Sequence, residues 1–147
     1  MADQTQGSIR IDAGPSVVMA EIADYESYPE WSSEIKQVEV KERDPQGRGK
    51  HVWYEVSNGP LRADYTLDYT YKDADAGVSW TFVEGNNIRD LQGEYTLTPD
   101  GDGTDVTYRM KVDTPILMLG FMKRGIERRI IDVALKGLKK RVESKRA

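Results

Sequence analysis

The segment 61–71 reads LRADYTLDYTY and alternates with a period of two. Its odd-numbered positions hold Leu, Ala and Tyr, whereas its even-numbered positions hold Arg, Asp and Thr. Strict alternation of this kind predicts a β-strand with one apolar, aromatic face and one polar face. Such a strand is wetted on one side only, so another apolar element must cover its dry face.

Similar segments flank this strand on both sides, separated by turn sequences such as Asp44–Gly47 and Asp100–Gly103. The expected strands are Gly7–Asp12, a segment that starts at Ile35, His51–Ser57, Leu61–Tyr71, Val78–Glu84, Ile88–Thr98 and Thr104–Asp113. The connections among the last six are short, whereas parallel pairing needs crossovers of about a dozen residues or more. The sequence therefore predicts an antiparallel sheet of seven strands.

Helical signals surround this block of strands. Pro15 followed by Val17–Ala23 predicts one short helix, and Tyr25–Ser33, broken by a proline, predicts a second. Pro115–Lys145 has helical periodicity and separates an apolar from a charged face. The expected fold class is α+β, with a curved sheet wrapped around the long C-terminal helix. We expect one domain over residues 1–147, with an ordered core over about 5–143.

Composition limits the chemistry. The 147 residues contain no cysteine and one histidine, His51, which excludes thiolate sites and multi-histidine metal centres. His51 shares the polar face of its strand with Glu55, so we expect a solvated side chain rather than a catalytic base. We assign no catalytic residue, and we expect no metal and no cofactor.

Charge is unevenly distributed along the chain. The net charge is −4, yet the segment from Pro115 onward carries ten Lys and Arg against three Asp and Glu. We interpret this as a basic helix on an acidic body, because a pI near 5.1 argues against a nucleic-acid binder. Met1–Ser8 lacks the pattern of a signal peptide, so a soluble, cytoplasmic protein is expected.

Aromatic residues dominate the predicted dry face. The rings expected to face the long helix are Tyr54, Tyr65, Tyr69, Tyr71, Trp80, Tyr95 and Tyr108. Buried tyrosine hydroxyls need hydrogen-bond partners, so the pattern favours a cavity for an amphipathic ligand. A solid aromatic core, with the hydroxyls reaching its rim, is the alternative.

The start of the long helix holds two anomalies. Lys123 and Glu127 fall inside its apolar face, although burying a charge without a partner is costly. They are interpreted either as a pair at the cavity mouth or as a satisfied pair at the surface. Ile116–Met122 is apolar on every side, which indicates burial or, alternatively, a cavity mouth that makes transient contact with a membrane.

Two segments carry a resemblance to a known family. These are Ile22–Trp31, with the spacing Asp-x-x-x-Tyr-Pro-x-Trp from Asp24, and Gly101–Tyr108, which precedes the long helix. They resemble the START-like helix-grip superfamily (SRPBCC), in particular the branch of polyketide cyclase/dehydrase and coenzyme-Q-binding-like bacterial proteins. The resemblance covers about Thr5–Glu143. It implies the helix-grip fold and an apolar ligand, since this superfamily binds lipids, hormones, quinones and polyketides and includes a few enzymes.

The function expected is that of a binding or carrier protein for an apolar or aromatic small molecule, such as a lipid, an isoprenoid quinone or a polyketide. A polyketide aromatase/cyclase is the enzymatic alternative, and an interaction module of a stress or regulatory pair is the second alternative. The protein is expected to be a monomer or weak dimer without a nucleic-acid partner. The candidate cavity residues are Trp31, Tyr54, Tyr65, Leu67, Tyr69, Trp80, Tyr95, Tyr108, Met110, Leu119, Met122, Lys123, Ile126, Glu127 and Ile130.

Overall fold

The computed structural model describes residues 5–58, 61–113 and 120–145, with the side chains of 58, 61 and 120–123 left out. The elements are β1 (Thr5–Ile11), α1 (Pro15–Ile22), η1 (Tyr25–Ser27), α2 (Tyr28–Trp31), β2 (Ile35–Arg43), β3 (Gly49–Asn58), β4 (Leu61–Tyr71), η2 (Asp73–Asp75), β5 (Gly77–Asn86), β6 (Asp90–Asp100), β7 (Gly103–Asp113) and α3 (Gly120–Ser144). The predicted order of one strand, two short helices, six strands and one long helix is confirmed.

One antiparallel sheet contains all seven strands, in the order β1-β7-β6-β5-β4-β3-β2. Its register brings aromatic residues side by side on one face. The cross-strand pairs are Tyr54 with Tyr65, Tyr69 with Trp80, and Tyr95 with Tyr108. The alternation of the sequence therefore placed the apolar face of these strands correctly.

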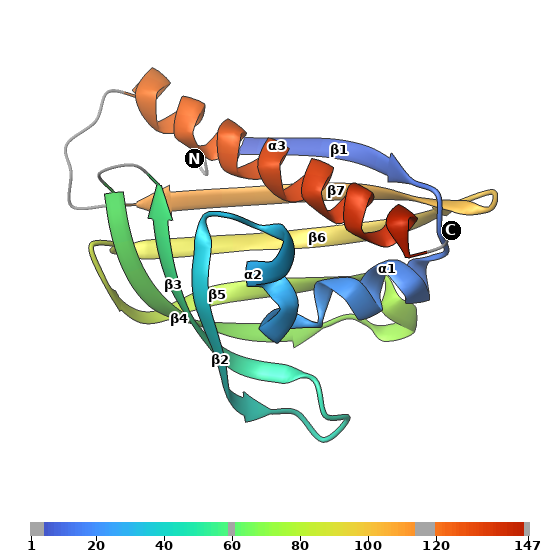
Figure 1. Ribbon diagram of the computed structural model, residues 1–147, viewed down its shortest axis with the longest axis horizontal. Helices are drawn as coiled ribbons and strands as arrows, with labels where there is room; N and C mark the ends of the chain where they lie inside the picture. Colours follow the sequence, from blue (N-terminus) through green and yellow to red (C-terminus); the bar gives the residue numbers. More distant parts are fainter. Residues whose placement is uncertain (1–4, 59–60, 114–119, 146–147) are drawn as a thin grey trace.

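Helix α3 lies along β1 and β7 across one part of the sheet (Figure 1). At Gly7 of β1, a side chain would bring a Cβ atom within 2.8 Å of the Ile131 side chain. The missing side chain thus lets the helix approach the strand closely. Further along α3, Leu135, Leu138 and Val142 are buried, as the helical periodicity predicts.

The beginning of the predicted long helix lies outside the described residues. Pro115–Leu119 lie outside the described residues, as does the greater part of Ile116–Met122, the segment expected to be buried or to touch a membrane. Among the described helices, none has both the length and the apolar character needed to cross a bilayer.

The sheet is incomplete between β5 and β6. These strands pair over Gly77–Trp80 and Gly93–Thr96, and the rest of β5 pairs with β4 alone. The two strands therefore separate from each other as they approach the turn that joins them. This parting leaves room beneath the first half of α3, at the end of the sheet where the cavity lies.

Candidate ligand-binding site

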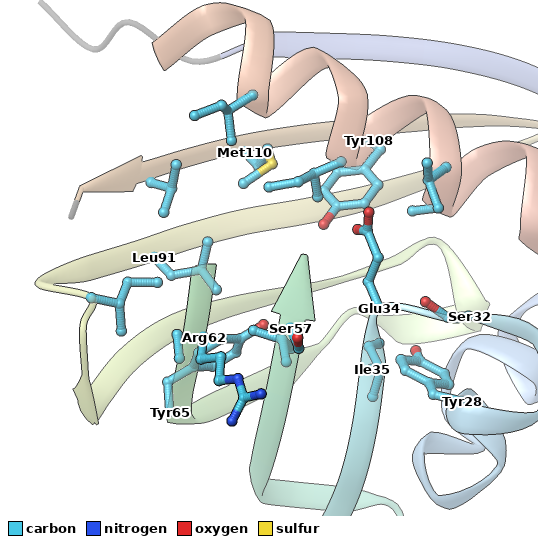
Figure 2. A pocket seen from close by; sticks show the side chains of 18 of the residues that line it. Tyr28, Ser32, Glu34, Ile35, Ser57, Arg62, Tyr65, Leu91, Tyr108 and Met110 are labelled. Carbon is cyan, nitrogen blue, oxygen red and sulfur yellow. The ribbon is translucent and has the colours of Figure 1, made fainter. Parts of the chain in front are cut away.

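A cavity of about 250 Å³ lies between the first half of α3 and the ends of several strands (Figure 2). Its walls come from α2, the start of β2, the turn-proximal ends of β3 and β4, and the facing parts of β6, β7 and α3. Most of the lining side chains are apolar. The apolar residues include Ile35, Val56, Ala63, Ile88, Leu91, Met110, Val112, Ile126, Ile130, Val133 and Ala134.

The structure brings only part of the sequence-predicted site together at this cavity. The predicted residues that line it are Trp31, Tyr65, Tyr95, Tyr108, Met110, Ile126 and Ile130. Leu119 and the side chains of Met122 and Lys123 lie outside what the structure describes. The other five, Tyr54, Leu67, Tyr69, Trp80 and Glu127, are buried away from the cavity lining.

Tyr54 and Tyr69 illustrate why the prediction was too broad. Their hydroxyl oxygens lie 2.5 Å apart and form a hydrogen bond inside the core. Burial raises the pKa of both hydroxyls well above its usual value, so both keep their protons. The sequence favours a cavity around the buried hydroxyls, with a solid aromatic core as the alternative, and the alternative holds for these two, which satisfy each other in a solid part of the core that also buries Leu67.

Trp80 lies in the wall between that solid core and the cavity. Its ring centre is 5.6 Å from the ring centres of Tyr95 and Tyr108, both of which line the cavity. The indole ring also packs on Gly93, where a Cβ atom would come within 2.6 Å of it. Trp80 therefore supports cavity residues from behind instead of facing the cavity itself.

Glu127 is fully buried. The sequence placed it, with Lys123, either at the cavity mouth or in a surface pair, and for Glu127 both interpretations are wrong. Its carboxylate accepts hydrogen bonds from the Thr5 hydroxyl at 2.7 Å and from the Val112 backbone N–H at 2.8 Å. These bonds join α3 to β1 and β7. The sheet thus supplies two hydrogen bonds to this carboxylate, which neither lines the cavity nor lies at the surface.

Three tyrosine hydroxyls give the cavity its polar character. Tyr65, Tyr95 and Tyr108 line it, and their hydroxyls have no hydrogen-bond partner among the described residues. Burial raises the pKa of all three, so they remain neutral groups that can donate or accept a hydrogen bond. The Trp31 indole N–H is likewise buried without a partner in the described part of the chain.

The cavity lining also contains two charged residues, Glu34 and Arg62, that the sequence analysis did not identify as site residues. Glu34 precedes β2 and extends into the cavity toward Tyr108 (Figure 2). Its carboxylate lies 3.6 Å from the Arg129 guanidinium of α3. Arg62 belongs to the polar set of the alternating segment 61–71, yet it lies where β4 has just begun and the cavity opens. Alternation predicts a face, but it does not predict where a sheet ends.

The apolar residues that the prediction missed had clearer signals. Val56 alternates with Tyr54, and Val112 alternates with Met110, so both share the predicted inner face. Ile88 was expected within a strand, whereas the structure places it in the turn before β6 with its side chain buried. Extending the predicted inner face to the strand ends would have found the two valines.

His51 lies away from the cavity lining, on the outer face of the sheet. Its Nδ1 atom is 3.3 Å from the Glu42 carboxylate, and its Nε2 atom is 3.7 Å from the Asp68 carboxylate. Among the residues that the structure describes, no group of three or more His, Cys, Asp or Glu could hold a metal ion.

A family model described as polyketide cyclase/dehydrase and lipid transport matches residues 3–143. No curated protein matches the chain. Among solved structures, a START superfamily protein from Mycobacterium smegmatis is similar with a TM-score of 0.88 and 19% identity, over 96% of this chain and 97% of that chain.

Two further structures share the fold. The ZhuI aromatase/cyclase from Streptomyces sp. R1128 has a TM-score of 0.80 and 14% identity, over 98% of this chain and 95% of that chain. The STAR-related lipid transfer protein from Xanthomonas axonopodis has a TM-score of 0.75 and 19% identity, over 94% and 84%. These neighbours establish the START-like helix-grip fold.

Proposed function

Because the chain belongs to the polyketide cyclase/dehydrase and lipid transport family, we propose that it binds and carries a compact apolar or aromatic molecule in the cavity beneath α3. The observation that carries this proposal is the set of hydroxyls of Tyr65, Tyr95 and Tyr108, which line an apolar cavity without partners in the described chain. An apolar ligand with a few oxygen atoms would bury its body against the walls and satisfy these hydroxyls.

The size of the cavity limits the range of ligands that can fit inside it. Its volume of about 250 Å³ is below the range of about 300–1,000 Å³ that ligand sites commonly have. A compact ring compound suits this space better than a lipid with two long chains. An isoprenoid quinone would place its ring in the cavity and leave its tail outside.

The second candidate function is that of a polyketide aromatase/cyclase. It is favoured by one observation, that a carboxylate and a guanidinium, Glu34 and Arg62, line the same cavity as three protonated tyrosines. These groups could hold a poly-β-ketone chain and move protons during ring closure. A test with a synthetic poly-β-ketone distinguishes the two functions, because a carrier returns it unchanged relative to the buffer control.

Native mass spectrometry of freshly purified protein tests the carrier proposal. We expect a bound apolar compound, seen as added mass that disappears on organic extraction. Protein stripped in this way should then bind a hydrophobic fluorescent dye with one site per chain. A protein that carries no compound and binds no apolar probe after extraction would contradict both candidate functions.

A further inference from the structure

Glu34 is a carboxylate that the backbone holds in a fixed position at the cavity. Its carbonyl oxygen accepts the Ser57 N–H at 2.9 Å, and the next residue, Ile35, donates its N–H to Ser32 at 3.2 Å. These bonds fix the residue at the point where β2 begins to pair with β3. The side chain is 21% exposed and extends across the cavity toward α3 (Figure 2).

The charges around Glu34 leave it available to a ligand. Its ion-pair partner Arg129 is 64% exposed and lies 3.6 Å away, so water solvates much of that guanidinium. Tyr65 keeps its proton, because burial and then the negative charge of Glu34 raise its pKa. Arg62, the other charged residue of the lining that the structure describes, is exposed to solvent.

An ionised carboxylate in a mostly apolar cavity discriminates among ligands. It only accepts hydrogen bonds, so a ligand hydroxyl that donates to it gains a charge-assisted bond. A purely apolar ligand removes water from the carboxylate and returns no hydrogen bond. A ligand carboxylate has no proton to donate to Glu34 and is repelled by its negative charge.

We propose that Glu34 is the residue that determines the specificity of the cavity, by selecting a compact ring compound with a hydroxyl group and rejecting the corresponding carboxylate. The inference rests on the proposed function, because it requires an apolar ligand in this cavity. In the proposed complex, the ligand hydroxyl donates its hydrogen bond to the Glu34 carboxylate. The tyrosine hydroxyls form hydrogen bonds with the other oxygen atoms of the ligand.

Three probes with one ring system test this assignment: 2-methylnaphthalene, 2-naphthol and 2-naphthoate. Their dissociation constants would be measured by equilibrium dialysis at pH 7 for the wild type, Glu34→Gln and Glu39→Gln. Glu39 is the matched control, since it is an exposed glutamate of β2 outside the cavity lining. The glutamine keeps the size of the side chain and removes its charge.

For the wild type we expect 2-naphthol to bind about tenfold tighter than either other probe. Glu34→Gln should reduce this preference over 2-naphthoate to about threefold or less, and Glu39→Gln should preserve it. An unchanged preference in Glu34→Gln would overturn the inference while leaving the proposed function intact. Failure of all three probes to bind the wild type would overturn both.

A second variant keeps the test decisive if Glu34→Gln does not fold. Arg129→Gln removes the counter-charge and retains the carboxylate of Glu34. It should weaken the binding of 2-naphthoate about threefold and leave 2-methylnaphthalene unaffected. Tighter or unchanged binding of 2-naphthoate by this variant would contradict the role given to Glu34.

Discussion

Glu127 carries a carboxylate into the packed contact between α3 and the strands β1 and β7. Replacing it by leucine keeps the apolar packing of the helix but removes the acceptor of the Thr5 hydroxyl and the Val112 N–H. Because these donors stay buried, we expect Glu127→Leu to lower the free energy of unfolding by about 2–3 kcal/mol. Urea unfolding followed by circular dichroism measures this change.

The control for Glu127 is Asp132, an exposed acidic residue of the same helix. Asp132→Ala should change the free energy of unfolding by no more than about 0.5 kcal/mol. Equal effects of the two substitutions would show that the buried carboxylate does not hold the helix on the sheet.

His51 gives the opposite prediction at the same scale. It lies on the outer face of the sheet near Glu42 and Asp68, and it does not line the cavity. His51→Ala should therefore shift the free energy of unfolding by about 0.5 kcal/mol or less and leave the affinity for an apolar dye unchanged. A loss of dye binding of more than about tenfold would point to a functional site on the outer face.

At the scale of elements, α3 presents two different surfaces to the sheet. Ile126 lines the cavity, whereas Ile131 is buried against Gly7 of β1. Ile126→Trp should fill the cavity, fold with nearly the stability of the wild type and abolish the binding of an apolar dye. Ile131→Trp is the matched variant in the closed part of the core, and it should cost about 1–3 kcal/mol through overpacking.

Thermal unfolding and dye titration of both variants distinguish a cavity from a solid core. If Ile126→Trp is destabilised as strongly as Ile131→Trp, the space beneath α3 is too tightly packed to admit a ring. If Ile126→Trp is stable and still binds dye with the affinity of the wild type, the ligand binds elsewhere.

Local patterns were sufficient to predict the fold. Alternation in segments such as Leu61–Tyr71 identified the strands, short turns such as Asp100–Gly103 implied antiparallel pairing, and helical periodicity identified the buried face of α3. Each of these features repeats within a few residues along the chain. The exact bounds were less predictable, since β5 and β6 begin and end one or two residues away from the expected positions.

The candidate site was only partly predictable, because its position depends on where strands separate. Tyr69 and Tyr108 have the same sequence signature, yet Tyr69 is closed in by Tyr54 whereas Tyr108 lines the cavity. The difference arises from the parting of β5 and β6 beyond Trp80. Glu34 carried no periodic signal at all, because it precedes the first alternating residue of β2.

At the scale of the whole molecule, a chain of ring contacts crosses the sheet. The ring centres of Tyr25 and Tyr69 lie 4.6 Å apart, those of Tyr69 and Trp80 lie 5.7 Å apart, and those of Trp80 and Tyr108 lie 5.6 Å apart. The chain connects the segment before α2 with β7 near the opposite edge. These rings therefore lie in one continuous interior, where burial raises the pKa values of the tyrosine hydroxyls.

This arrangement predicts a loss of stability in alkaline solution. The pKa values of all eight tyrosines are raised, with burial as the first cause. An unfolded tyrosine ionises near pH 10, whereas the folded protein retains the proton. The native state then binds more protons than the unfolded state, so the free energy of unfolding falls as pH rises, by about 1.4 kcal/mol per pH unit for each such tyrosine.

Urea unfolding at intervals from about pH 8 to about pH 11 measures this slope, with tyrosinate absorbance as a second reading of the native state. The double variant Tyr54→Phe/Tyr69→Phe is the informative comparison, because it removes both partners of one buried hydrogen bond and is expected to be nearly neutral at pH 7. Above pH 10 its free energy of unfolding should fall less steeply with pH than that of the wild type. The difference between the two slopes should correspond to about two protons per molecule. If the slope is the same in both proteins, the buried Tyr54 and Tyr69 hydroxyls are not what makes the fold sensitive to alkali, and the other six tyrosines or lysine deprotonation at the surface would have to account for it.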